Sequence, residues 1–387
     1  MKREVAASAR KGALVVVGVS AALALVLAVP LARASEGVTS TTSALSSTPV
    51  TRDSSTTTTT STTTTSSTTP PVSSLIAAGP SRSECLTPNF ADTGLASLQT
   101  AVTKFDTVTG STVTCLSVYL GSAKGWADWE NPWVIDPSTG YVPWVAEAPQ
   151  SRQLVLAVQL IPTNLENVKN PINWERSCAS GKFNAYARNL GSNLVAAGLA
   201  NSVIRLGSEM NGVWESDFIG TTKVEQKLWA KCFANEVVSL RQVSGEHFLI
   251  DWNVNACTGV YPYANYYPGN SYVDIIGIDV YDVACRTPFT KVSFSKLASE
   301  QLGINDLQAF AAAKHKPMSL PEWGLATVPA GDDPSYINGI GTKVEQGDFS
   351  FQTYFDGGGG PNSKSLGLSS GTPLSDAAYK KWFGNGA

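Results

Sequence analysis

Residues 203–214 read VIRLGSEMNGVW, and this stretch decides how the rest of the chain is interpreted. A short apolar run leads to Glu209, and an Asn-Gly turn pair and a tryptophan follow it. The order is typical of a β-strand whose end presents a carboxylate at the mouth of a site. A lone glutamate after a strand is more often a solvated loop residue. A second stretch, PMSLPEWG at residues 317–324, also ends an apolar run in a glutamate, Glu322, so the sequence favours a pair of functional carboxylates.

The first 74 residues are unlike the rest of the chain. Residues 1–34 combine a basic start, an apolar run over residues 13–32 and small residues around position 33, which is the pattern of a secretory signal. An apolar run of about 20 residues is also long enough to remain as a membrane anchor. Residues 35–74 are dominated by Ser and Thr and offer little to bury, which predicts a disordered linker. The protein is therefore expected to be secreted or extracytoplasmic, with a possible tether at its N-terminus.

Residues 75–387 are long enough for one large domain. The net charge of −3 and the charged fraction of 15% argue against a nucleic-acid surface. The chain has only two histidines, His247 and His315, and neither has a partner at ligand spacing, so we expect no metal site. No glycine-rich nucleotide or dinucleotide motif opens a helix, so we expect no cofactor.

Short β-branched runs alternate with stretches of helical periodicity throughout this domain. The expected strands lie near residues 74–78, 113–119, 154–161, 203–207, 248–252, 273–281, 317–320 and 350–354. The clearest expected helices lie near residues 95–105, 183–199, 224–240 and 302–315. Eight strands in about 310 residues favour an α/β fold of the (β/α)8 TIM-barrel class over an open sheet.

All six cysteines lie in this domain, and their even number in an exported protein suggests three disulfides. Fifteen pairings are possible. Because consecutive strands are neighbours in a barrel, the economical pairing is Cys85 with Cys115, Cys178 with Cys232, and Cys257 with Cys285.

In such a barrel the chemistry lies at the C-terminal ends of the strands. Glu209 would end the fourth strand and Glu322 the seventh, so the two carboxylates would face each other across the mouth. A protonated and an ionised carboxyl on either side of a bond are what glycoside hydrolysis needs. Serine chemistry lacks a plausible histidine here, and cysteine chemistry lacks a free thiol.

Four motifs in order resemble clan A glycoside hydrolases, most closely glycoside hydrolase family 26, best known for β-mannanases. They are RLGSEMNGVW at residues 205–214, DWNVN at 251–255, YVDIIGIDVY at 272–281 and EWG at 322–324. The resemblance implies that Glu209 is the acid/base, that Glu322 is the nucleophile, and that the anomeric configuration is retained. It also implies that Arg205 and Tyr281 lie beside the nucleophile.

The chain departs from the family pattern at two places. The family usually has a histidine immediately before the acid/base, where this chain has Ser208, and another near the end of the second strand, where Tyr119 lies. Both histidines help to shape the sugar site in mannanases. Their absence puts mannan as the substrate in doubt more than it does hydrolysis.

Aromatic and polar side chains complete the predicted sugar site, because sugar faces stack on tryptophan and tyrosine rings. The predicted substrate-binding residues are Arg205, Asn211, Trp214, Trp126, Trp252, Asn255, Tyr281 and Trp323. Trp133 and Trp144 are as compatible with the core as with the site. Glu215 and Asp217 are interpreted as rim residues, and Asp251 and Asp279 as structural.

Two classes of function fit these residues. The first is a secreted retaining endo-glycosidase that hydrolyses a β-linked polysaccharide, β-mannan or a related glycan. The second is a non-catalytic carbohydrate-binding or cell-envelope protein on a barrel scaffold. Two intact carboxylates at strand ends favour the enzyme, and a hydrolase of the organism's own envelope glycan is a third possibility. The expected partner is a polysaccharide or oligosaccharide, and the protein is expected to be a monomer.

Overall fold

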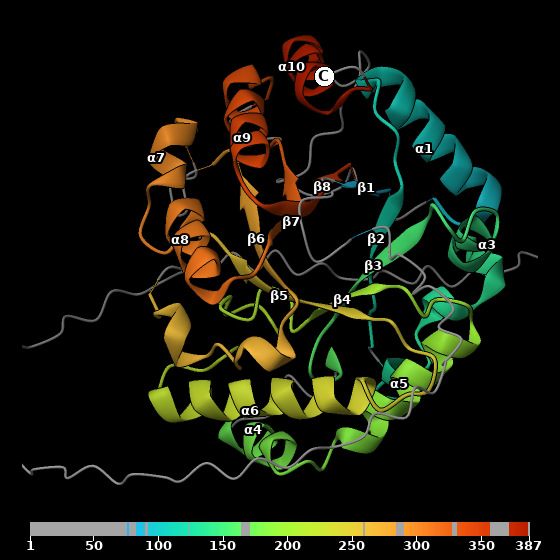
Figure 1. The fold of residues 1–387 in the computed structure, drawn as a ribbon, viewed down its shortest axis with the longest axis vertical. Helices are drawn as coiled ribbons and strands as arrows, with labels where there is room; N and C mark the ends of the chain where they lie inside the picture. Colours follow the sequence, from blue (N-terminus) through green and yellow to red (C-terminus); the bar gives the residue numbers. More distant parts are fainter. Residues whose placement is uncertain are drawn as a thin grey trace, which may run out of the picture. The chain divides into compact units, whose positions relative to one another are not determined.

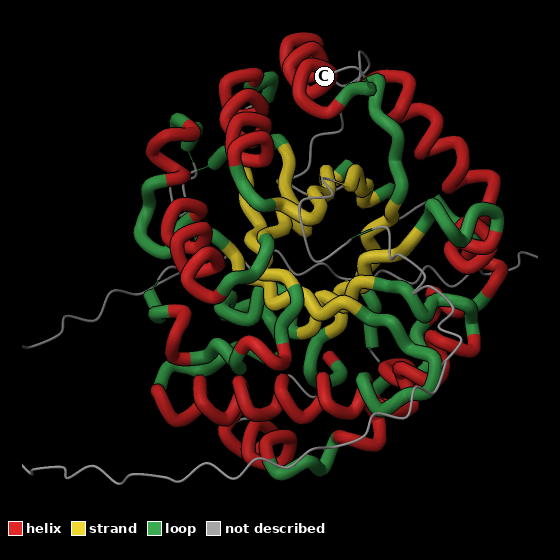
Figure 2. Tube along the Cα trace, viewed as in Figure 1, coloured by secondary structure: helices red, strands yellow, loops and turns green. Residues whose placement is uncertain are grey.

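The computed structural model describes residue 76 and residues 83–89, 92–122, 124–163, 171–257, 260–283, 290–326, 331–356 and 371–385. Eight parallel strands form a closed barrel in sequence order, β1 to β8. The strands are β1 (Ser83–Thr87), β2 (Cys115–Tyr119), β3 (Gln153–Val158), β4 (Val203–Leu206), β5 (Leu249–Asn255), β6 (Ile275–Tyr281), β7 (Met318–Gly324) and β8 (Phe349–Phe355). The predicted (β/α)8 class is confirmed, and Figure 2 shows the closed ring of strands inside its shell of helices.

Helices surround the barrel on its outer side (Figure 1). They are α1 (Leu95–Thr109), α2 (Trp126–Glu130), α3 (Tyr141–Ala146), α4 (Pro171–Ala179), α5 (Asn184–Ala196), α6 (Lys223–Leu240), α7 (Phe294–Ala298), α8 (Ile304–Lys314), α9 (Pro334–Gln346) and α10 (Pro373–Phe383). Only short 3-10 turns, at Tyr263–Asn265 and Asn270–Tyr272, are described between β5 and β6. The four helices expected from periodicity correspond to α1, α5, α6 and α8.

The longest helix, α6, begins where its sequence predicts. The hydroxyl of Thr222 accepts a hydrogen bond from the backbone N–H of Glu225, and the carboxylate of Glu225 accepts one from the backbone N–H of Thr222. This reciprocal capping box satisfies two backbone donors that the first turn leaves unpaired. It fixes the start of the helix that follows the Glu209 loop.

The first predicted strand, near residues 74–78, is wrong. Of these residues only Ile76 is described, and it lies in a bend, whereas β1 begins at Ser83. The backbone N–H of Ile76 donates to the side chain of Gln153, and the fully buried Ile76 side chain packs inside the lower end of the barrel. Its partners there are Cys85, Cys115, Val155, Val203, Ile275 and Phe351. Ile76 therefore helps to close the floor of the barrel instead of joining its wall.

Two predicted disulfides are present. Cys85 is bonded to Cys115 in the adjacent strand, and Cys178 of α4 is bonded to Cys232 of α6. Cys257 is also disulfide-bonded, and its predicted partner, Cys285, lies outside the described residues. The observed pairs join neighbouring βα units, which is the adjacency from which they were predicted.

The predicted signal or anchor (residues 1–34) and linker (residues 35–74) lie outside the described residues. Among the residues that the structure describes, no helix is long and apolar enough to cross a membrane.

Glu84 gives the barrel wall a buried ionisable group on its outer side. Its carboxylate accepts hydrogen bonds from Gln352 of β8 and from the hydroxyl of Tyr379 in α10. Burial raises the pKa of Glu84 to about 8, although both hydrogen bonds lower it. The folded protein therefore keeps a proton on a group that titrates near 4.5 when it is exposed.

Replacing Glu84 with glutamine is expected to weaken the pH dependence of stability. The unfolded chain releases the Glu84 proton at lower pH than the folded protein does, so stability falls as pH rises from about 4.5 to about 8. Across this window, the free energy of unfolding in urea should change by up to about 1.4 kcal/mol less per pH unit in Glu84→Gln. The exposed Glu345 on α9 provides a control, because Glu345→Gln should keep the wild-type slope. If the free energy of unfolding changed with pH equally in Glu84→Gln and in the wild type, the raised pKa of Glu84 would be contradicted.

Candidate active site

Two glutamates meet at the C-terminal end of the barrel. Glu322 lies in β7, and Glu209 lies in the turn that follows β4. One carboxylate oxygen from each of Glu209, Glu322 and Asp279 lies within 4.8 Å of the other two. Both glutamates are half-buried, so the strand ends present them to solvent at the mouth.

The backbone at Glu209 is unusual for a residue with a side chain. Its φ is 54°, in the left-handed region that few residues other than glycine adopt and that recurs at functional sites. Gly207, two residues earlier, has a φ of 60°, and a Cβ there would lie 2.6 Å from the ring of Trp229. This tight turn is what carries the Glu209 side chain over the barrel end.

Two donors hold the carboxylate of Glu209. The side-chain amide of Asn255 donates to Oε1 at 2.6 Å, and the indole of Trp214 donates to Oε2 at 2.9 Å. Burial and then the charge of Glu322 raise the pKa of Glu209, although Asn255, Trp214 and Arg205 lower it. A carboxyl whose pKa is raised in this way is suited to donate a proton.

Glu322 is held by two phenols. The hydroxyl of Tyr281 donates to its Oε1 at 2.6 Å, and the hydroxyl of Tyr119 donates to its Oε2. Burial and the neighbouring Glu322 charge raise the pKa of both tyrosines, so both remain protonated donors. Each oxygen of the Glu322 carboxylate therefore has a phenol donor that fixes its orientation.

Arg205 lies beneath the carboxylates and is fully buried. Its guanidinium is paired with Asp279 at 2.7 Å, donates to the side chain of Asn253 at 2.7 Å, and lies 5.7 Å from the ring centre of Tyr119. Burial lowers the pKa of Arg205, but Asp279, Tyr119 and Glu322 together raise it above its usual value. The prediction that Arg205 contacts substrate is wrong, because it has no exposed surface; it acts as the buried counter-charge of the site.

The predictions that Trp252 and Trp323 bind sugar are also wrong, because both side chains are fully buried. Successive side chains of a strand point to opposite faces, and Asn253 and Asn255 of β5 point toward the site. Trp252 therefore points outward, against Tyr266 and Phe310, and Trp323 likewise stacks on Tyr379 of α10.

The remaining predicted binding residues divide between the site and its supports. Trp214 is 43% exposed beside Glu209, and Asn255 and Tyr281 each hold a catalytic candidate. Asn211 is buried and exchanges two hydrogen bonds with the backbone of Asn255, so it braces the site. The ring of Trp126 stacks on Tyr186 of α5 at 4.1 Å, which covers one of its faces.

The structure separates the residues that the sequence left undecided. Trp133 is 41% exposed, and its indole donates to the backbone carbonyl of Tyr119. Trp144 is fully buried and belongs to the core. Tyr119 is the last residue of β2, and this position at a strand end is the signal that could have placed it in the site. Asp217 is not a rim residue: it is fully buried and accepts a hydrogen bond from the backbone N–H of Leu160.

The three clustered carboxylates could in principle hold a cation. Arg205 already supplies a positive charge at this position, and four hydrogen-bond donors hold the oxygens of the two glutamates. Their proximity therefore needs no metal to explain it. A second cluster, Cys178, Cys232 and Glu236, cannot supply two thiolates because its cysteines form a disulfide.

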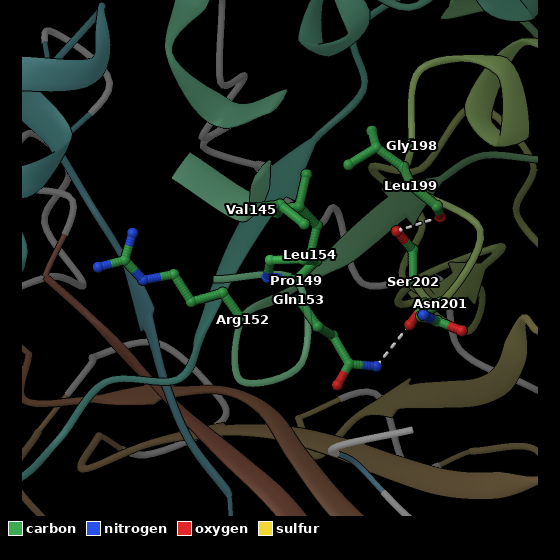
Figure 3. A pocket seen from close by; sticks show the side chains of 9 residues that line it. All are labelled: Val145, Pro149, Arg152, Gln153, Leu154, Gly198, Leu199, Asn201 and Ser202. Carbon is green, nitrogen blue, oxygen red and sulfur yellow. Dashed lines mark hydrogen bonds between the residues drawn. The ribbon is translucent and has the colours of Figure 1, made fainter. Parts of the chain in front are cut away.

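A small pocket, partly open to solvent, lies at the opposite end of the barrel. Figure 3 shows its lining, which includes Gln153 at the start of β3 and Ser202 just before β4. Gln153 donates to the backbone carbonyl of Asn201 there and accepts from Ile76. This pocket belongs to the floor of the barrel and is separate from the carboxylate pair.

Residues 179–299 match the family model described as glycosyl hydrolase family 26. The matched part is less than half of the chain; it contains Glu209 and Tyr281 but not Glu322. No curated protein matches the chain closely enough to count as a relative.

Several solved structures share the fold. The catalytic domain of a family 26 endo-β-1,4-mannanase from Bacillus sp. JAMB-750 is 17% identical, with 78% of this chain and 85% of that chain covered and a TM-score of 0.55. A family 26 β-mannanase from Bacteroides ovatus is 14% identical, with 73% and 85% covered and a TM-score of 0.51. The mannanase BCman from Bacillus subtilis is 15% identical, with 78% and 85% covered and a TM-score of 0.51.

At these identities the solved structures show the barrel fold alone, and the family match covers the segment that carries Glu209. Together they confirm the resemblance to glycoside hydrolase family 26 that was drawn from the four sequence motifs.

Proposed function

We propose that the protein is a retaining endo-glycosidase that acts on a β-mannan-type polysaccharide, with Glu209 as acid/base and Glu322 as nucleophile. The observation that carries this proposal is the approach of the two carboxylates, whose nearest oxygens lie within 4.8 Å. Retaining glycosidases place their carboxyl groups about 5–5.5 Å apart, whereas inverting enzymes leave roughly 6.5–9.5 Å for a water molecule. The short approach supports direct attack by one carboxylate.

The two environments suit the two roles. In the first step Glu209 gives its proton to the glycosidic oxygen, and an oxygen of Glu322 forms a bond to the anomeric carbon as the bond to the leaving sugar breaks. In the second step the Glu209 carboxylate takes a proton from water, and the resulting nucleophile releases Glu322 from the sugar. The raised pKa of Glu209 supports the acid role, and the two phenols that donate to Glu322 orient its carboxylate for attack.

A β-mannan is the favoured substrate class because the solved structures that share this fold are described as mannanases. Ser208 and Tyr119 stand where that family usually has histidines, so related β-glycans and the organism's own envelope glycan are the alternatives. A panel of mannan, xylan, mixed-linked and β-1,3-glucans and wall glycans, with product analysis, tests this choice. Release of short oligosaccharides from mannan supports the proposal, and activity only on another glycan contradicts the substrate class.

An extracytoplasmic location is part of the proposal. The signal-like pattern of residues 1–34 supports it, and so do the disulfides Cys85–Cys115 and Cys178–Cys232, because disulfides persist in oxidising compartments. N-terminal sequencing of the exported protein distinguishes a cleaved signal from a retained anchor.

The variant Glu322→Gln is expected to abolish turnover and leave the fold intact. Glutamine keeps the size of the side chain but cannot form the glycosyl ester, so activity on the best substrate of the panel should fall to background. Circular dichroism and thermal unfolding should match the wild type within a few degrees. Wild-type activity in this variant would exclude Glu322 as the nucleophile.

The variant Glu209→Ala is expected to discriminate between leaving groups. Loss of general-acid assistance should lower the rate on glycans, which have poor leaving groups, by about 10²–10⁴. Aryl glycosides with acidic phenol leaving groups need little protonation, so their glycosylation step should fall much less. A uniform loss over both substrate types would be incompatible with an acid/base role for Glu209.

The variant Trp214→Phe is expected to move the alkaline limb of the pH–rate profile upward. The indole of Trp214 stabilises the ionised form of Glu209 and so lowers its pKa. Phenylalanine keeps an aromatic ring but removes the donor, so Glu209 should stay protonated to higher pH than in the wild type. The measurement is kcat/KM against pH. A limb that stays in place or moves to lower pH would refute this role of the indole.

A further inference from the structure

A second polar pair adjoins the carboxylate pair at the ends of β3 and β4. The side-chain amide of Gln159, the residue after β3, donates to Oε2 of Glu215. The hydroxyl of Ser208, immediately before Glu209, lies 3.4 Å from the side-chain oxygen of Gln159. Ser208, Gln159 and Glu215 therefore form a continuous polar wall beside the acid/base candidate.

The pair is held firmly from behind. The indole of Trp129 donates to the backbone carbonyl of Gln159 at 2.7 Å. The buried carboxylate of Asp217 accepts from the backbone N–H of Leu160 at 2.8 Å, which joins the residue after Gln159 to the loop that carries Glu215. The loops after β3 and β4 are thus fixed to each other, and preorganised side chains of this kind discriminate well between ligands.

The front of the pair is open. Gln159 and Glu215 are half-buried, and no donor among the described residues contacts Oε1 of Glu215. Glu215 is also within electrostatic range of both catalytic candidates: burial, Glu209, Asp217 and Glu322 raise its pKa to about 9. A largely neutral carboxyl that faces the mouth can both donate to and accept from a hydroxyl group.

We propose that Gln159 and Glu215 form the specificity-determining wall of the sugar site, where Glu215 binds one hydroxyl group of a neutral sugar next to the cleaved bond. This rests on the proposed glycosidase function and extends it, since Glu215 takes no part in the two chemical steps. A site built to hydrogen-bond a hydroxyl rejects the analogue that lacks it, because a buried polar group is left unpaired. Glu215 is thereby assigned a contact with substrate that Glu209 and Glu322 do not make.

The test pairs each variant with substrates that lack one hydroxyl group. The probes are mannotetraose and mannotetraoses that lack a single hydroxyl on either sugar flanking the cleaved bond, and the measurement is kcat/KM for wild type, Glu215→Ala and Glu215→Gln. In the wild type, one analogue should be cleaved roughly 10–100-fold less well than mannotetraose. Glu215→Ala should lose a similar factor on mannotetraose and should cleave that analogue within about threefold of the parent. Glu215→Gln, which keeps an oxygen and a donor, should retain part of the discrimination.

The outcomes separate this inference from the function on which it rests. If the wild type neither binds nor cleaves mannotetraose, the proposed function fails and the inference fails with it. If the wild type cleaves mannotetraose but Glu215→Ala keeps every single-hydroxyl penalty, only the inference is overturned. A general loss of folding would lower all substrates equally and leave the ratios unchanged, and Gln159→Ala provides a second variant that should weaken the same ratio. Glu345→Gln, at an exposed position of α9, should leave every ratio at its wild-type value.

Discussion

One buried cation makes the chemistry of this barrel possible. Three carboxylates, Glu209, Glu322 and Asp279, place oxygens within 4.8 Å of one another, and such a cluster is unfavourable in a poorly hydrated site unless it is compensated. Arg205 compensates it from below, with its guanidinium 2.7 Å from Asp279. The ion pair with Arg205 involves Asp279 on the buried side of the three carboxylates, and Glu209 and Glu322 remain accessible from the mouth.

The same constraint explains why the two glutamates have different partners. Glu322 accepts from two phenols, whereas Glu209 accepts from an amide and an indole. Tyr119 contacts both Glu322 and the buried Arg205: its hydroxyl donates to Glu322, and its ring centre lies 5.7 Å from the Arg205 guanidinium. A change at Tyr119 would therefore disturb both Glu322 and Arg205.

The sequence predicted the barrel and the carboxylate pair because both depend on local patterns. Strand periodicity, helix spacing and a glutamate at two strand ends are all visible in short windows. The sequence could not predict that Trp252 and Trp323 point away from the site, because a strand that is buried on both faces gives no sign of which face points toward it. The expected strand near residues 74–78 was wrong for a related reason: an apolar residue such as Ile76, which packs into the barrel floor, has the same sequence signal as a strand residue. Contacts between distant units, such as Gln159 with Glu215, need the register of the closed barrel and cannot be read from spacing.

The pH response of the mouth depends on carboxyls and not on imidazoles, because Ser208 and Tyr119 stand where family 26 usually has histidines. The chain has two histidines, His247 and His315, and each directly precedes the residues leading into a strand, β5 and β7, at the floor end of the barrel. No imidazole is therefore available at the mouth, where the carboxyls Glu209 and Glu215 both have a raised pKa. Burial is the largest cause that raises the pKa of both glutamates; the charge of Glu322 adds to it for Glu209, and the charge of Glu209 adds to it for Glu215. The indole of Trp214 and the amide of Asn255 oppose this rise at Glu209, so these two donors set how far the pKa of its carboxyl moves.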